Sequence, residues 1–181
     1  MMFTRTKIPD VILVEPRLFP DARGDFYEGY RRDRFAANGI PGEFVQDNYS
    51  RSAKGVVRGL HYQMAPKTQA KLIQVIRGAV FDVAVDLRRG SPTFGQWVGA
   101  TLTGENHRLL YIPAGFAHGF CALEDDTAVM YKVSDFYSPE HERGIRWDDP
   151  VLGIAWPALD VPYQLSERDR DYPVLQDAVL A

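Results

Sequence analysis

The sequence has a single cysteine, Cys121, so it cannot form an intrachain disulfide. No run approaches the ~18 apolar residues that a transmembrane helix needs. The opening stretch, MMFTRTKIPD, lacks the apolar core of a signal peptide. We therefore expect a cytoplasmic protein that does not enter a membrane. The net charge of −3 lacks the basic excess that general nucleic-acid binding requires, so we expect no nucleic-acid partner.

Helical periodicity is also scarce. Residues 30–40 (YRRDRFAANGI) favour one short helix that ends at Gly39. The rest consists largely of short apolar stretches, such as KLIQVIRG, QWVGATLT and TAVMYKVSDFY, that turn residues separate. Many short strands at even spacing are typical of an antiparallel sandwich or barrel. We expect one all-β domain over residues 1–181, with short peripheral helices and an irregular tail over about residues 138–181.

Two histidines end glycine-containing motifs. GVVRGLH has the spacing G-x5-H and ends at His61, and IPAGFAHGF has the spacing P-x-G-x-x-H, with its histidine at His118. Together these resemble the two signature motifs of the cupin superfamily, which are small β-barrels of the jelly-roll kind. In metal-binding cupins a second histidine and a glutamate follow the first motif, but Gln63 and Lys71 stand at those positions. An amide is a poor ligand and an ammonium group repels a cation, so we expect no metal site.

Strand alternation places Lys71 on the same face as Ile73 and Val75. A lysine on an apolar inward face requires a reason, and beside two histidines its charge suits an anion that forms in the barrel. The alternative is that Lys71 lies solvated at the barrel mouth, since lysine is rarely fully buried. We favour the inward position.

Tyr131 lies on a strand that follows the second histidine motif. A two-residue turn at Glu124-Asp125 would place it opposite His118, in one cavity with both histidines. On the residues alone, a structural role is the more common outcome for a strand tyrosine. Asp82 is a further inward-pointing candidate, which could hold Lys71 or His118 in place.

Several long strings identify the chain more closely. They are DARGDFYE, FVQDNYSRSAKGVVRGLHYQ, QAKLIQVIRGAVFDVAVDLRRGSPTFGQW, YIPAGFAHGF, YKVSDFYSPEHERGIRWDDP and LSERD. In this order they resemble the dTDP-4-dehydrorhamnose 3,5-epimerases, which are non-metal cupins of deoxysugar nucleotide metabolism. The resemblance runs from about Phe19 to about Asp171, nearly the whole chain.

The resemblance implies a reaction without a metal or other cofactor. The substrate would be a dTDP-4-keto-6-deoxyhexose, dTDP-4-dehydro-6-deoxy-D-glucose, with C3 and C5 both inverted to give dTDP-4-dehydro-L-rhamnose. His61 would be the base and Tyr131 the acid on the opposite face. Lys71, with or without His118, would face the enolate oxygen. Asp169, in LSERD, would orient His61, although Asp82 stays open as an alternative.

The resemblance also implies a nucleotide site and a homodimer in which N-terminal strands, about residues 1–30, are exchanged. The phosphate ligands would be Arg23, Arg58 and Arg168, the last at a position where the family commonly has lysine. The residues that frame the base and sugar would be Phe26, Glu28, Gln46, Asp47, Asn48, Phe136 and Glu142, with Gln63 in support. Phe136 stands where many members have the first tyrosine of a Tyr-Tyr pair.

Three alternatives remain. A single-centre epimerase would invert C3 or C5 alone, with Phe136 the first residue to suspect. A metal-dependent cupin oxygenase would need ligands that Gln63 and Lys71 do not supply. A binding protein without catalysis would leave the substrate unchanged. One geometric question also stays open: simple alternation puts Arg58 and His61 on opposite faces, unless a bulge at Gly59 brings them together.

Overall fold

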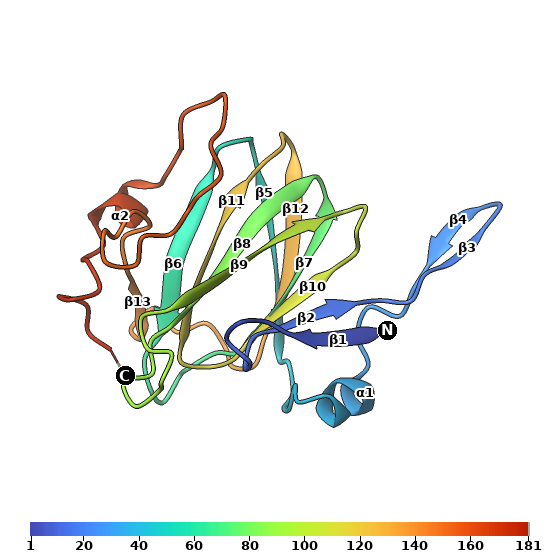
Figure 1. The fold of residues 1–181 in the computed structure, drawn as a ribbon, viewed down its shortest axis with the longest axis horizontal. Helices are drawn as coiled ribbons and strands as arrows, with labels where there is room; N and C mark the ends of the chain where they lie inside the picture. The colour runs from blue at the N-terminus through green and yellow to red at the C-terminus, as the bar shows by residue number, and fades with distance from the viewer. Residues whose placement is uncertain (181) are drawn as a thin grey trace.

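Two antiparallel sheets face each other in the computed structural model, which describes residues 1–180 (Figure 1). The six-stranded sheet contains, in spatial order, β1 (Met2–Arg5), β2 (Ile12–Glu15), β10 (Leu109–Ile112), β7 (Lys71–Arg77), β12 (Thr127–Val133) and β5 (Gln46–Ser52). The five-stranded sheet contains β13 (Glu142–Gly144), β6 (Val57–Gln63), β11 (Phe116–Ala122), β8 (Ala79–Asp86) and β9 (Trp97–Thr103). The all-β expectation is confirmed.

Only short helices accompany the sheets in the described residues, as expected. The segment 30–40 forms α1 (Arg32–Ala37), and Gly39 follows it with φ +87°, the left-handed conformation that favours glycine after a helix. The tail forms α2 (Glu167–Asp171) and the strand β13, which pairs with β6. None of the helices in residues 1–180 has the length and hydropathy needed to span a membrane.

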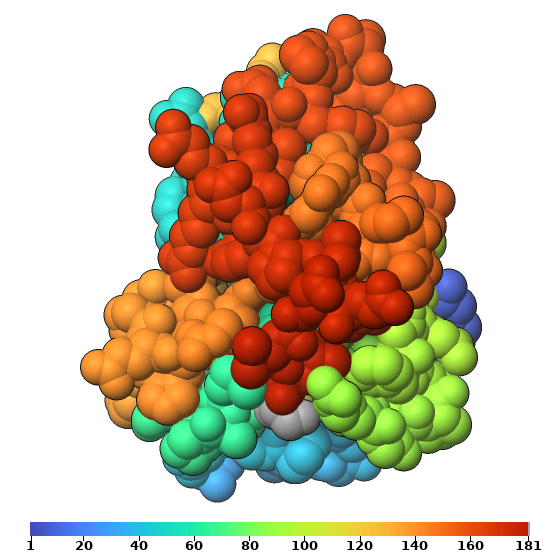
Figure 2. Space-filling view, turned by 90° about the vertical axis from the view of Figure 1, so that its left-hand side faces the viewer, coloured from blue at the N-terminus to red at the C-terminus, as the bar shows by residue number. Residues whose placement is uncertain are grey.

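The main core lies between the sheets, where Ile73, Val75 and Val129 of one sheet pack with Val80 and Phe120 of the other. A second core covers the outer face of the five-stranded sheet, because tail residues including Leu152 and Leu175 pack there. Figure 2 shows the C-terminal segment spread over this side of the molecule. Strand β11 is therefore buried on both faces and its residues do not alternate between apolar and polar.

The expected hairpin between the second histidine motif and the next strand is not formed. Strand β11 pairs with β6 and β8, whereas β12 pairs with β5 and β7 in the other sheet. His118 and Tyr131 are thus not cross-strand neighbours. They face each other across the barrel instead, with ring centroids 6.4 Å apart, so the shared cavity is confirmed although the turn geometry was wrong.

The N-terminal strands divide into two parts. Strands β1 and β2 belong to the chain's own six-stranded sheet, where β2 pairs with β10. Strands β3 (Phe19–Asp21) and β4 (Gly24–Phe26) form a separate hairpin that extends away from the barrel (Figure 1). Phe19 and Phe26 on this hairpin are exposed.

Candidate active site

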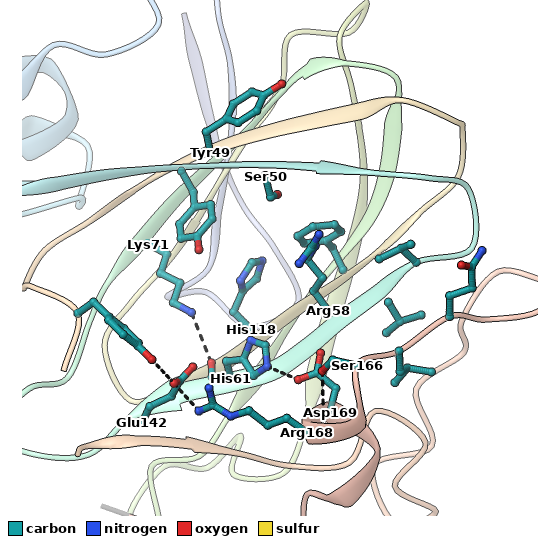
Figure 3. A pocket seen from close by; sticks show the side chains of 17 residues that line it. Tyr49, Ser50, Arg58, His61, Lys71, His118, Glu142, Ser166, Arg168 and Asp169 are labelled. Carbon is teal, nitrogen blue, oxygen red and sulfur yellow. Dashed lines mark hydrogen bonds and ion pairs between the residues drawn. The ribbon is translucent and has the colours of Figure 1, made fainter. Parts of the chain in front are cut away.

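A cavity of about 650 Å³ opens between the two sheets and is bounded on one side by the tail. Figure 3 shows side chains from both sheets pointing into it. Its polar lining residues are Tyr49, Ser50, Arg58, His61, Lys71, His118, Tyr131, Tyr137, Glu142, Gln164, Ser166, Arg168 and Asp169. The candidate groups for proton transfer and charge stabilisation are His61, Lys71, His118, Tyr131 and Asp169. The first four lie on strands, and Asp169 lies on the helix α2.

A bulge is present at Gly59, a point that the sequence left open. His118 pairs with His61 and Phe120 with Arg58, so two residues of β6 between these pairs lie opposite one residue of β11. Gly59 has φ +117°, and a Cβ there would lie 2.6 Å from the Cα of Gly119. Only glycine fits so close an approach. The extra residue brings Arg58 and His61 into one cavity, which answers the question that strand alternation left open.

His61 bonds to the carboxylate of Asp169, with Nε2 2.6 Å from Oδ1. The other carboxylate oxygen accepts the backbone N–H of Gly59. Burial raises the pKa of Asp169, but these hydrogen bonds and the charge of His61 together outweigh burial and hold it below its usual value. An ionised carboxylate accepts the Nε2 proton, so the free electron pair of His61 is on Nδ1. Asp169, rather than Asp82, is the partner of His61.

The tail holds Asp169 in place through backbone contacts. Ser166 caps α2 by accepting the N–H of Asp169 at 3.1 Å. Two residues earlier, Gln164 exchanges backbone hydrogen bonds with Gly55 and Val57 at the start of β6. The carboxylate and the imidazole are thus tied to the same strand.

His118 makes a second pair, with Nε2 2.9 Å from Oδ2 of Asp82. Both groups are buried: Asp82 is fully inaccessible and His118 is 6% exposed. Burial lowers the pKa of His118, although the charge of Asp82 opposes the shift. The expectation that Asp82 holds His118 agrees with this geometry.

Lys71 lies at the base of the cavity, where it is 9% exposed and its ammonium group approaches the backbone carbonyl of His61 at 3.4 Å. Its inward position is confirmed, and the solvated alternative is not. Burial lowers its pKa to about 8, against the opposing charges of Asp82 and Glu142. The group is therefore still largely protonated at neutral pH.

Tyr131 projects into the cavity from β12, on the wall opposite His61. Burial raises the pKa of its hydroxyl; the charge of Glu142 adds to this shift and the charge of Arg58 opposes it. The hydroxyl therefore keeps its proton at neutral pH and is available as a donor.

Three charged or hydroxyl side chains form a network at the rim. The carboxylate of Glu142 accepts the Tyr137 hydroxyl at 2.6 Å and pairs with the guanidinium of Arg168 (Figure 3). Burial raises the pKa of Glu142, but the hydrogen bonds from Tyr137 and Arg168 outweigh it and leave the group ionised. On the cavity wall, the Nε–H of Arg58 donates a hydrogen bond to Oγ of Ser52 at 3.1 Å, which orients the guanidinium group.

Some of the predicted residues lie outside the cavity. Arg23 and Phe26 are exposed on the β3–β4 hairpin, and Glu28 pairs with Arg31 and Arg34. Asp47 pairs with Lys132 on the outer face of its sheet. Gln46 and Asn48 line a smaller adjoining pocket of about 100 Å³.

Gln63 and Phe136 have structural positions in this chain. Gln63 lines the smaller pocket and bonds to the backbone of Lys67, Phe136 and Ser138, so it fixes the loop after β12. The ring of Phe136 is 60% exposed and is not among the cavity residues; its neighbour Tyr137 is. Of the Phe136-Tyr137 pair, the structure thus places Tyr137 at the cavity, whereas the sequence had suggested Phe136.

Sequence reasoning also missed Tyr49, Ser50 and Phe120 in the cavity lining. Phe120 could have been found, because it lies two residues after His118 and shares its strand face. Tyr49 and Ser50 carried no signal beyond an ordinary strand pattern. Among residues 1–180, no group of three or more His, Cys, Asp or Glu side chains is arranged to hold a metal ion.

The fold and the cavity define a class of protein: a cupin-type barrel whose interior presents a histidine–carboxylate pair, a tyrosine hydroxyl and a buried ammonium group. Residues 5–177 match the family model for dTDP-4-dehydrorhamnose 3,5-epimerase. The chain belongs to this family of isomerases.

Individual relatives agree over nearly the full length. The chain is 58% identical to dTDP-4-dehydrorhamnose 3,5-epimerase of Pseudomonas aeruginosa over 179 residues, 98% of each chain. It is also similar to a crystal structure of dTDP-6-deoxy-D-glucose-3,5-epimerase from Legionella pneumophila in complex with dTDP-4-keto-L-rhamnose. That similarity has a TM-score of 0.93 at 49% identity and covers 97% of this chain and 93% of the other. A dTDP-4-dehydrorhamnose 3-epimerase of Streptomyces niveus is 45% identical over 91% of this chain and 79% of its own.

Proposed function

We propose that this protein epimerises dTDP-4-dehydro-6-deoxy-D-glucose at C3 and C5, by proton removal on one face of the sugar and proton return on the other. The observation that carries the proposal is the placement of His61 and Tyr131 on opposite walls of one cavity, which Lys71 also lines. The family and the ligand of the Legionella pneumophila structure support the substrate class.

The first step uses His61 and Lys71. The ketone at C4 acidifies the C–H bonds at C3 and C5. His61 Nδ1 takes the proton, and the electron pair of the C–H bond moves into an enolate whose negative charge lies on O4. The Lys71 ammonium stabilises that oxygen. A neutral His118 that donates its Nε2 hydrogen bond to Asp82 has only Nδ1, an acceptor, left to face the substrate. An acceptor cannot stabilise the enolate oxygen, so Lys71 is favoured for that role.

The second step uses Tyr131. Its hydroxyl donates a proton to the opposite face of the same carbon, and the electron pair returns from the enolate to form the new C–H bond. The substrate and product are isomers, so no electron, atom or cofactor is consumed. His61 and Tyr131 return to their starting protonation states by proton exchange with solvent before the second carbon reacts.

The nucleotide half of the substrate would lie toward the rim. Arg58 and Arg168 line the cavity there, and a guanidinium group can hold phosphate oxygens in a bidentate manner. Arg168 is paired with Glu142 in this structure, so a diphosphate would compete for it with that carboxylate. Gln46 and Asn48 face the adjoining pocket, beside Tyr137, and are candidates for contacts to the sugar or base.

We further propose a homodimer in which the β3–β4 hairpin reaches the partner's cavity. The hairpin extends away from its own barrel and carries Arg23 and Phe26, both of which are exposed (Figure 1). A cation and an aromatic ring suit a diphosphate and a thymine base. The chain's own cavity lacks these two residues.

Solvent deuterium incorporation tests the reaction. After turnover in D₂O, mass spectrometry and NMR of the product should find one deuteron at C3 and one at C5. Label at C3 alone would assign the single-centre reaction, which is named for the Streptomyces niveus relative. Unlabelled, unchanged substrate would contradict catalysis and leave a binding protein.

A further inference from the structure

Tyr172 contacts His61 directly, although it is not among the residues expected at the site. The two rings are edge to face, with centroids 5.7 Å apart and an interplanar angle of 73°. Tyr172 is the C-cap residue of α2, three positions after Asp169. Residues three apart at a helix end project from the same side. One short helix therefore contacts His61 twice, through a carboxylate and through an aromatic ring.

Gly144 makes room for this ring. It lies on β13 directly beside His61 in the register of the sheet, and a methyl group at this position would overlap the Tyr172 ring. Its φ is not in the left-handed region, so the backbone itself does not require glycine. The reason for glycine at 144 is the space that Tyr172 occupies.

The hydroxyl of Tyr172 contributes little to this arrangement. It is buried and has no hydrogen-bond partner among residues 1–180. The guanidinium of Arg168 stands 5.7 Å from the ring centroid. The contact with His61 is thus made by the aromatic ring rather than by a polar group.

We propose that Tyr172 is a positioning residue, a wedge between β13 and α2 that limits rotation of the His61 imidazole and keeps Nδ1 aimed into the cavity. Asp169 fixes one nitrogen, and a single hydrogen bond leaves the ring free to swing about that contact. The Tyr172 ring, which packs against the imidazole, restricts this rotation. The kinetic consequence rests on the proposed function, in which His61 is the base.

A double-mutant cycle between Gly144→Ala and Tyr172→Ala tests the wedge. Each single variant should lower kcat by about tenfold to 10²-fold, the scale for a misplaced catalytic group. KM, and the Kd for dTDP from calorimetry, should stay near the wild-type values. In the Tyr172→Ala background, Gly144→Ala should lower kcat hardly any further, because the ring that the new methyl group would displace is already absent.

Two controls separate the wedge from general loosening of the tail. Tyr172→Phe keeps the ring and should behave like the wild type. Tyr163→Ala removes another tail tyrosine, whose ring centroid lies 4.8 Å from that of Trp147 and which is not among the cavity residues. This variant should leave kcat unchanged.

The imidazole NMR signals of His61 in the free protein provide a readout that does not depend on the substrate, so failure of the proposed function would not obscure it. Tyr172→Ala and Gly144→Ala should each broaden these signals, and Tyr172→Phe should not. Wild-type signals in both alanine variants, or a Gly144→Ala cost that persists without Tyr172, would overturn the proposal. A loss of dTDP affinity that matches the loss of rate would also overturn it.

Discussion

The two histidine–aspartate pairs of the cavity have the same chemistry in different surroundings. Asp82 and His118 come from β8 and β11, which are neighbours in one sheet, and both side chains are buried. His61 comes from the adjacent strand β6, but its aspartate is on the tail, 108 residues further along the chain. The His61 side chain is 30% exposed, against 7% for that of His118.

The difference shows how one pair of residue types can serve two purposes. Burial lowers the pKa of His118, which favours its neutral form, and the hydrogen bond to Asp82 holds the ring in place. His61 has its carboxylate partner on one side and the cavity on the other, so it can accept a proton and pass it to water. We therefore expect the His61–Asp169 pair to act in proton transfer and the His118–Asp82 pair to act in binding and structure.

Removal of His61 should give the largest effect. The loss of one positioned general base typically costs ~10²–10⁴-fold in rate. In His61→Ala, kcat should fall on this scale while calorimetry finds dTDP affinity nearly unchanged, because Arg58 and Arg168 remain. Wild-type turnover in this variant would remove His61 from the mechanism, and the same loss in His118→Ala with unchanged affinity would reverse the comparison between the two pairs.

Tyr131→Phe should separate the two proton transfers. Product formation should slow by about 10²-fold, but wash-in of solvent deuterium into the substrate should slow less. The enolate still forms through His61 and Lys71, and it can take a deuteron back on the His61 face. Mass spectrometry of substrate and product in D₂O measures both rates. Equal losses would show that the hydroxyl is needed before the enolate forms.

Asp169→Asn and Asp82→Asn compare the carboxylates directly. An amide at 169 can hold His61 in the wrong tautomer, so kcat should fall by roughly tenfold to 10²-fold with the stability little changed. Asp82→Asn should instead reduce the free energy of unfolding by about 1–3 kcal/mol, because it weakens a buried, charge-assisted hydrogen bond. Steady-state kinetics and denaturant unfolding of both variants decide between these outcomes, and matching profiles would show that the pairs are equivalent.

The pH dependence of kcat/KM should report Lys71. The free enzyme needs the protonated ammonium, whose pKa burial lowers to about 8, so kcat/KM should fall about tenfold per pH unit above that value. Stability should move the opposite way. Between about 8 and 10.5 the unfolded chain binds the proton that the folded chain has lost, so the Lys71 contribution to stability rises with pH.

Lys71→Gln should lower the rate and remove this alkaline limb. Circular dichroism across the same pH range checks that the variant stays folded. If the limb persists in the variant, it belongs to another group, and Tyr131 is the first candidate.

Chelation should have the smallest effect. If the two histidines served as metal ligands, EDTA would abolish activity and a divalent ion would restore it. With Lys71 and Gln63 at the remaining ligand positions, we expect unchanged kcat after chelation and no stoichiometric metal by elemental analysis. Recovery of activity on addition of a divalent ion would contradict this expectation.

The barrel could be predicted from local signals, since turn residues such as Gly78 do separate the strands and the glycine–histidine spacings do mark cavity positions. The assignment of strands to sheets could not. A short connection between β11 and β12 suggests a hairpin, yet these strands cross from one sheet to the other. In a jelly roll such crossovers are set by packing of the whole barrel, which a single turn does not encode.

The site shows the same division. Lys71 was predictable because strand alternation applies to a regular strand such as β7. Tyr172 was not, because its role depends on how α2 meets β13, and no periodicity links residues 144 and 172. The bulge at Gly59 is intermediate, since the sequence raised the question and only the register of β6 against β11 answers it.

The position of Asp169 makes the orientation of His61 depend on an intact C-terminal tail. A cut between Gln164 and Ser166 would sever the link from the backbone pairing of Gln164 to the Ser166 cap, so only the packing of the remaining tail would hold the carboxylate that bonds to His61. Arg58, Lys71 and Tyr131 lie on strands of the barrel, so the cut would leave them in place. A preparation can therefore lose specific activity while its size, secondary structure and ligand binding change little.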